Sequence, residues 1–268
     1  MGDAGMILFG PAGREVLAAG TIIFAVFATG SQLLAGQTAL SALSDSRLCL
    51  MLYTGVFAVP TLLFSLPRTM DRLSWLSIPA VASILVAGVI GMVGAGLHPV
   101  EGRTVDIARS SDFVAAFVSI TNPGFATSFY VVFSVVTYYY LGSEVSSPSF
   151  SSLPPVWAKA AYGVAIPNFL IAGSLYSHTA AKLVFVRMFR RSRHLHQHSV
   201  LGWGVWVFLI FLANGAAFVL AVGVPIFNYL IGISASLFAS WYTYGIAGFF
   251  WLYDAYHYGH TSVAKVQR

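Results

Sequence analysis

A short polar run interrupts one apolar stretch of the sequence. Residues 113–141 contain no Asp, Glu, Lys or Arg, and their middle reads Ser119-Ile120-Thr121-Asn122-Pro123-Gly124-Phe125-Ala126-Thr127. Pro123 has no backbone N–H and its ring clashes with the carbonyl four residues back, while Gly124 accepts almost any backbone angle. We therefore expect a helix to break here. A broken helix inside a bilayer is a candidate binding site; the alternative is a Pro-Gly kink that serves only packing.

Histidines offer a second possible chemistry, that of a membrane metalloenzyme with histidine boxes. His257 and His260 follow Asp254 at three-residue spacing, and a basic loop contains His194, His196 and His198. Imidazole is a common metal ligand, but seven histidines with this spacing do not supply ligands for two irons. We expect a solvated loop and a polar tail, with no metal, no cofactor and no enzyme activity. No Walker loop, dinucleotide-binding glycine motif or Ser/His/Asp arrangement stands out.

The composition places these residues in a membrane. Of 268 residues, 57% are hydrophobic and 9% are charged, against roughly 45 to 50% and 25% in soluble domains. A helix of about 20 apolar residues crosses a bilayer. Seven segments meet this length, so we predict an all-α membrane protein with about seven transmembrane segments in a single domain, 1–268: the segments are 16–43, 48–66, 73–97, 113–141, 156–186, 203–224 and 227–253.

Two of these segments have features that bear on packing. The first follows a turn at 10–13 and contains Thr29-Gly30-Ser31-Gln32, small and polar residues that suit close helix approach and hydrogen bonds between helices. The segment 156–186 contains Pro167-Asn168, where we expect a second kink. The single cysteine, Cys49, excludes an internal disulfide.

Basic residues indicate the orientation in the membrane but do not decide whether the segment 113–141 crosses it once or twice. Arg187, Arg190, Arg191 and Arg193 lie in one loop, which the positive-inside rule places in the cytoplasm. The basic residues do not form a surface interleaved with aromatic residues, so we do not expect nucleic-acid binding. The segment 113–141 would be about 43 Å long as a helix, which favours one tilted crossing over two. One crossing places Arg68 on the side opposite Arg187, whereas two crossings place both on one side.

Several motifs together resemble the amino acid/auxin permease family. They are Ser65-Leu66-Pro67-Arg68-Thr69 followed by Leu73-Ser74-Trp75-Leu76-Ser77-Ile78, then His178-Thr179-Ala180-Ala181-Lys182, Gly202-Trp203, and Leu237-Phe238-Ala239-Ser240-Trp241-Tyr242-Thr243-Tyr244-Gly245. The resemblance covers almost the whole chain. It implies a leucine-transporter-like bundle of two inverted five-helix repeats in a plasma or vacuolar membrane. The implied activity is secondary transport of neutral amino acids, with the proton as the coupling ion that fungal relatives suggest.

The chain also departs from the family pattern. By the resemblance, segment 16–43 matches the third helix, so the first two helices are absent, as are part of the sixth and seventh region near Ala126 and the last helix after Asp254. The family orientation also places Arg68 and Arg187 on the same side, which a single crossing at 113–141 forbids. We therefore expect an incomplete bundle. A remnant that does not transport, or an accessory membrane protein, is the alternative.

The resemblance also implies which residues would bind the substrate. The family builds its site on the first, third, sixth and eighth helices, and the last three are represented here. The implied site residues are Ser31 and Gln32, then Thr121, Asn122, Pro123 and Gly124, and then Ser174, Ser177 and Thr179. For each of them the alternative is a packing role. No acidic residue inside a segment marks a proton route.

Overall fold

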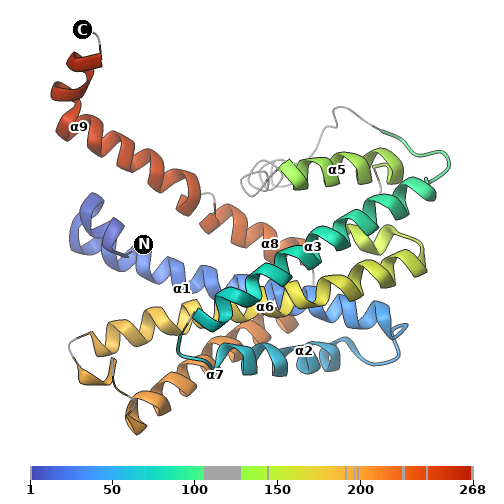
Figure 1. Ribbon diagram of the computed structural model, residues 1–268, viewed down its shortest axis with the longest axis horizontal. Helices are drawn as coiled ribbons and strands as arrows, with labels where there is room; N and C mark the ends of the chain where they lie inside the picture. Colours follow the sequence, from blue (N-terminus) through green and yellow to red (C-terminus); the bar gives the residue numbers. More distant parts are fainter. Residues whose placement is uncertain are drawn as a thin grey trace.

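The chain folds into a bundle of helices, shown by a computed structural model in Figure 1. The structure describes residues 2–69, 71–105, 128–143, 145–190, 192–195, 197, 199–224, 227–239 and 241–266. All regular structure in these residues is helical. The predicted helix break at Pro123 and Gly124 lies outside them.

The first helix, α1 (Gly2–Leu43), contains a reversal near its start. Gly10 has φ 67° and ψ −157°, a backbone conformation that glycine adopts readily, and Pro11 follows it. The residues before Gly10 therefore fold back, and Gly5 packs against the backbone of Gly13 so closely that neither position has room for a side chain. This confirms the turn predicted at 10–13, after which α1 continues without interruption to Leu43.

Helix α6 (Pro155–Phe189) is the centre of the bundle and packs against α1, α2 (Leu50–Ser65), α3 (Asp71–Leu97) and α7 (Val200–Gly223). Figure 1 shows it running through the middle of the molecule. It remains helical through Pro167, so the predicted kink does not end the helix. Two ion pairs mark its ends, and we name the ends after them: Lys159 bonds Asp45 at 2.6 Å at the Asp45 end, and Arg187 pairs with Glu15 at the Arg187 end.

Helices α3 and α5 (Ser128–Leu141) are parallel neighbours. Phe129 lies against Gly88, Phe133 approaches Gly91 and Tyr140 approaches Gly96, so the two helices advance in the same direction. At the Asp45 end, the Ser143 N–H donates to the Thr104 carbonyl at 3.1 Å. Helices α3 and α5 therefore both finish at the Asp45 end.

This arrangement corrects the expectation of a single crossing by 113–141. Arg68 donates through Nη2 to the carbonyl of His194 at 3.3 Å, which places Arg68 at the Arg187 end. Both basic regions therefore lie on the same side, as the family orientation implies. Helix length alone could not report the direction in which Ser128–Leu141 runs, which its contacts with α3 establish.

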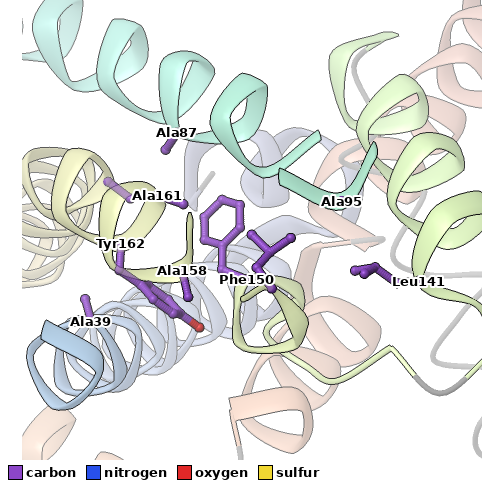
Figure 2. Packing of buried hydrophobic residues seen from close by; sticks show 10 residues of the cluster. Ala39, Ala87, Ala95, Leu141, Phe150, Ala158, Ala161 and Tyr162 are labelled. Carbon is purple, nitrogen blue, oxygen red and sulfur yellow. The ribbon is translucent and has the colours of Figure 1, made fainter. Parts of the chain in front are cut away.

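An apolar cluster joins α6 to α3 and α5. The 3₁₀ turn η2 (Ser149–Ser152) inserts Phe150, whose ring centroid lies 5.5 Å from that of Tyr162 and 5.8 Å from that of Phe133. Alanines surround the two rings in Figure 2, where Ala158 and Ala161 come from α6 and Ala87 and Ala95 from α3. Small side chains let the helix backbones approach closely.

The last part of the chain is less regular. Helix α8 (Phe227–Ser234) leads into the π-helical segments η4 (Ala235–Ala239) and η5 (Trp241–Gly245), and then into α9 (Ile246–Val266). Tyr242 bonds the Leu17 carbonyl at 2.9 Å, and the rings of Phe249 and Phe9 meet edge to face. In Figure 1 the end of α9 extends away from the other helices.

The described helices support an integral membrane protein. Four are long and apolar enough to span a bilayer: Gly2–Leu43, Trp75–Leu97, Pro155–Phe189 and Val200–Gly223. The apolar helices Leu50–Ser65 and Val131–Leu141 are shorter. Large apolar side chains such as Val59, Val135 and Phe208 are exposed on the outside of the bundle, as lipid contact requires. Seven crossings and a leucine-transporter-like arrangement remain predictions.

Candidate functional site

Uncharged polar side chains gather where α6 meets α1, α2 and α7. We call this group the polar seam. Its members are Thr29 and Gln32 of α1, Thr61 and Ser65 of α2, Ser174, Ser177 and His178 of α6, and Asn214 of α7. All except Gln32 are buried.

Serines and a threonine connect α2 to α6. The Ser174 hydroxyl donates to the carbonyl of Thr61 at 3.0 Å and to that of Leu170 at 2.7 Å. In return, the Ser65 hydroxyl approaches the Ser174 carbonyl at 3.3 Å and bonds the Thr61 carbonyl at 2.7 Å. Such bonds hold membrane helices together where no hydrophobic effect does so.

An amide and an indole connect α7 to the other helices. Asn214 donates through Nδ2 to the Ser177 hydroxyl at 2.6 Å and to the Ile210 carbonyl at 3.0 Å. Near the Arg187 end, the Trp206 indole N–H donates to the Leu66 carbonyl at 2.7 Å. These bonds fix the position of α7 along α6 and α2.

A glycine allows α1 to approach α6. The Thr29 hydroxyl bonds the Ala25 carbonyl at 2.8 Å and lies 3.5 Å from the Gly173 carbonyl. A Cβ atom at position 173 would lie 3.2 Å from the Cβ of Gln32 and 3.3 Å from the Cγ2 of Thr61. Position 173 therefore has little room for any side chain.

Three buried atoms of the polar seam have no hydrogen-bond partner within the described residues. They are the Gln32 Oε1, the His178 Nε2 and the Asn214 Oδ1. His178 is 0% exposed; its Nδ1 lies 3.4 Å from the Ser65 carbonyl and its ring packs edge-on against Trp206. An unpartnered buried polar atom costs about 1 to 3 kcal/mol. These three atoms can therefore bond a solute or water molecules that enter the bundle.

The residues expected from the sequence fall into three groups. Gln32, Ser174 and Ser177 lie in the polar seam. Ser31 is buried and bonds the Ala28 carbonyl of its own helix at 2.8 Å, and Thr179 bonds the Leu175 carbonyl at 2.7 Å and lines a separate pocket. Thr121, Asn122, Pro123 and Gly124 lie outside the described residues, so the complete proposed site stays a prediction.

The sequence analysis did not select His178 or Asn214 as site residues. Asn214 had a readable signal, because it is an amide in the middle of an otherwise apolar 24-residue helix, where polar residues face the bundle interior. His178 is a charge-capable residue in the same setting. Thr61 and Ser65 carry a weaker signal, since hydroxyls commonly bond their own helix.

A second feature, the pocket that Thr179 lines, opens at the Arg187 end between α1 and α6. Its volume is about 730 Å³, and four cations border it: Arg14, Lys182, Arg187 and Arg190. For metals, the described residues contain no group of three or more His, Cys, Asp or Glu side chains. His196 and His198 and the side chains of His257 and His260 lie outside the description.

The chain is similar to known transporters. Residues 2–126 match the family model described as "Transmembrane amino acid transporter protein". A "Transmembrane transporter" of Gibberella moniliformis is 28% identical over 92% of this chain, and one of Fusarium pseudograminearum is 26% identical over 92%. The "N amino acid transport system protein" of Neurospora crassa is 24% identical over 90%.

The matches cover only part of these relatives. The chain spans 61%, 60% and 60% of their respective lengths. No solved structure matches it.

Proposed function

We propose, on the premise that the chain is a member of an amino acid permease family, that it forms a single transport domain that moves neutral amino acids across a membrane. Amino acid transport follows from the family. Selectivity for neutral amino acids is our proposal beyond this. The Neurospora crassa relative named as an N amino acid transport system protein agrees with it. The curated relatives carry transporter names, which argues against an enzyme.

The observation that carries neutral selectivity is the uncharged polar seam. The buried polar side chains of the described residues are hydroxyls, amides and one imidazole, with no carboxylate, ammonium or guanidinium. A charged substrate side chain buried here would lack a counter-ion and would cost several kcal/mol. The ends of a zwitterion are accommodated more easily, because the Gln32 and Asn214 oxygens accept from its ammonium group and broken-helix backbone donors bind its carboxylate.

The proton is the proposed coupling ion. Among the described residues, His178 is the one buried side chain that ordinarily titrates near neutral pH. Within the part of the chain that the structure describes, its Nε2 has no hydrogen-bond partner, so that atom can take up a proton. Leucine-transporter-like packing and a location in the plasma or vacuolar membrane belong to the same proposal.

A different reading assigns the chain an accessory role without transport. It is favoured by the seam itself, because the Ser174 and Ser177 hydroxyls are both engaged in hydrogen bonds and fully buried. In the transport proposal these bonds exchange for substrate contacts when the helices move.

Uptake by proteoliposomes that contain the purified chain separates the two readings. Radiolabelled alanine and glutamine are compared with lysine and glutamate, with and without an inward proton gradient. We expect concentrative uptake of the first pair only, and only with the gradient. Equal uptake of lysine or glutamate contradicts neutral selectivity. No uptake by protein that is folded, as judged by a cooperative thermal transition, favours the accessory role.

A further inference from the structure

The pocket between α1 and α6 at the Arg187 end, which we call the basic pocket, has a net positive border. Arg14, Lys182, Arg187 and Arg190 supply four positive charges, and Asp3 and Glu15 supply two negative ones. The net formal charge of these six side chains is therefore +2.

The two carboxylates are already engaged. Asp3 lies 3.7 Å from Arg14, and Glu15 pairs with Arg187. Within the described residues, neither Lys182 nor Arg190 has a carboxylate within 4.0 Å. Two cations that face one pocket without a counter-ion attract an anion, and an arginine guanidinium can bond a phosphate with two parallel N–H groups.

The inner wall of the basic pocket is apolar. Ala18 and Ile22 of α1 face Leu183 and Val186 of α6. Arg14 and Ile22 are eight residues apart, so the pocket extends about 12 Å along α1 from its charged border. Val186 on this wall and Val16 beside the pocket are exposed, as lipid-facing residues are. A ligand with an anionic head and an apolar chain matches both parts, whereas a free anion uses only the border.

The position of the basic pocket in the membrane is consistent with such a ligand. Arg68, Arg187 and Arg190 share this end, which the positive-inside rule assigns to the cytoplasm. The cytoplasmic leaflet contains the anionic phospholipids, and basic pockets between transmembrane helices on this side suit their head groups.

We propose that the basic pocket binds an anionic phospholipid. Its phosphate lies between Lys182 and Arg190, and an acyl chain follows the apolar wall toward Ile22. Lys182 contributes a compact charge inside the pocket, and Arg190 bonds the phosphate from the border. The site is independent of which solute the protein carries, so it stands even if the neutral amino acid proposal fails.

Binding is measured with the full chain in nanodiscs of phosphatidylcholine, titrated with a soluble fluorescent phosphatidylinositol phosphate or phosphatidylserine. The test variant is Lys182→Gln/Arg190→Gln. Each Lys or Arg near an anionic surface contributes about 1 kcal/mol, which is about fivefold in affinity. We therefore expect about 25-fold weaker binding of the anionic lipid by the double variant.

Arg47→Gln/Arg193→Gln is the matched control, since it removes two cations that do not line the basic pocket. It should bind within twofold of the original chain, and both variants should melt at the original temperature in phosphatidylcholine. Equal losses in the two variants would show a general charge effect and overturn the site. Full competition by inorganic phosphate or by free glutamate would overturn the lipid assignment in favour of a soluble anion.

Discussion

The two faces of α6 are built in different ways. Toward α3 and α5 it presents alanines and Tyr162, which pack around Phe150, and the Tyr162 hydroxyl lies 2.7 Å from that of Ser151 at the end of the cluster. Toward α1, α2 and α7 it presents Ser174, Ser177 and His178, which bond backbone and side-chain groups of the neighbouring helices. Helix α6 therefore has one face that makes apolar helix contacts and one that makes polar helix contacts.

The difference assigns separate roles to the two faces. In lipid, an apolar contact is stabilised by close packing alone, and nothing in it can recognise a solute. A polar contact offers donors and acceptors, and in the polar seam three of them are unpartnered. We expect changes on the apolar face to alter stability, and changes on the polar face to alter transport more than stability.

The largest expected effect is on the apolar face. Phe150→Ala removes a ring that is 9% exposed and packs between Phe133 and Tyr162. We expect the free energy of unfolding to fall by about 3 kcal/mol. This is the low end for phenylalanine truncation, because the denatured state in lipid is also apolar. Unfolding in mixed micelles measures it. Phe208→Ala, at a residue 64% exposed, is the control, and equal losses in the two variants would contradict a packed role for Phe150.

On the polar face, Asn214→Leu tests the recognition role. It removes the bond to Ser177 and the free Oδ1. We expect amino acid uptake to fall at least tenfold, while stability changes by only about 0.6 kcal/mol, the average for such bonds in membranes. Thr137→Val is the matched control, because its hydroxyl is also buried and bonds the Phe133 and Ser134 carbonyls of its own helix. Normal uptake by the Asn214 variant would remove the distinction between the faces.

A smaller effect tests how closely the polar face packs. Gly173→Ala places a methyl group 3.2 Å from the Cβ of Gln32 and 3.3 Å from a methyl of Thr61. We expect this overpacking to lower the free energy of unfolding by about 1 kcal/mol. Gly163→Ala lies on the same helix and meets only Leu43 at 3.7 Å, so its melting temperature should be unchanged or higher. A stabilising effect of both substitutions would contradict close packing between α1 and α6 at Gly173.

The smallest effect lies outside both faces, at the Asp45 end. The hydrogen bond and charge of Lys159 lower the pKa of the Asp45 carboxyl below 3.8. A lowered folded-state pKa stabilises the protein above the unfolded-state value, and this contribution disappears as the pH falls through the folded-state pKa. Melting curves of the original chain and of Asp45→Asn should therefore differ by a small constant amount from pH 7 to 5 and should converge as the pH falls below the folded-state pKa of Asp45.

Apolar runs in the sequence predicted the limits of two helices closely, but the expected segment 227–253 is divided between α8, the π-helical segments and α9. The limits of α3 and α7 lie within three residues of those expected for 73–97 and 203–224. The turn before α1 was also readable, because Gly10 and Pro11 leave few backbone alternatives.

Which helices pack together was not readable. Thr61 and Ser65 contact Ser174 more than 100 residues away, and no local pattern reports that distance. The same holds for the face on which Thr179 lies, since a hydroxyl bonded to its own helix can point toward either neighbour. The site hypothesis therefore named residues of α1 and α6 that lie in the polar seam, but not Asn214 of α7 or the hydroxyls of α2.

The parallel contact between α3 and α5 has a consequence for biosynthesis. Adjacent antiparallel helices can enter a bilayer together as a hairpin, but a parallel pair cannot. Phe129 can therefore meet Gly88 only after synthesis has passed Ser128, well beyond the end of α3 at Leu97. Until then the side of α3 that carries Gly88 and Gly91 lacks the aromatic rings of α5 that cover it in the folded protein, so α3 is an incompletely packed membrane helix at that stage of synthesis.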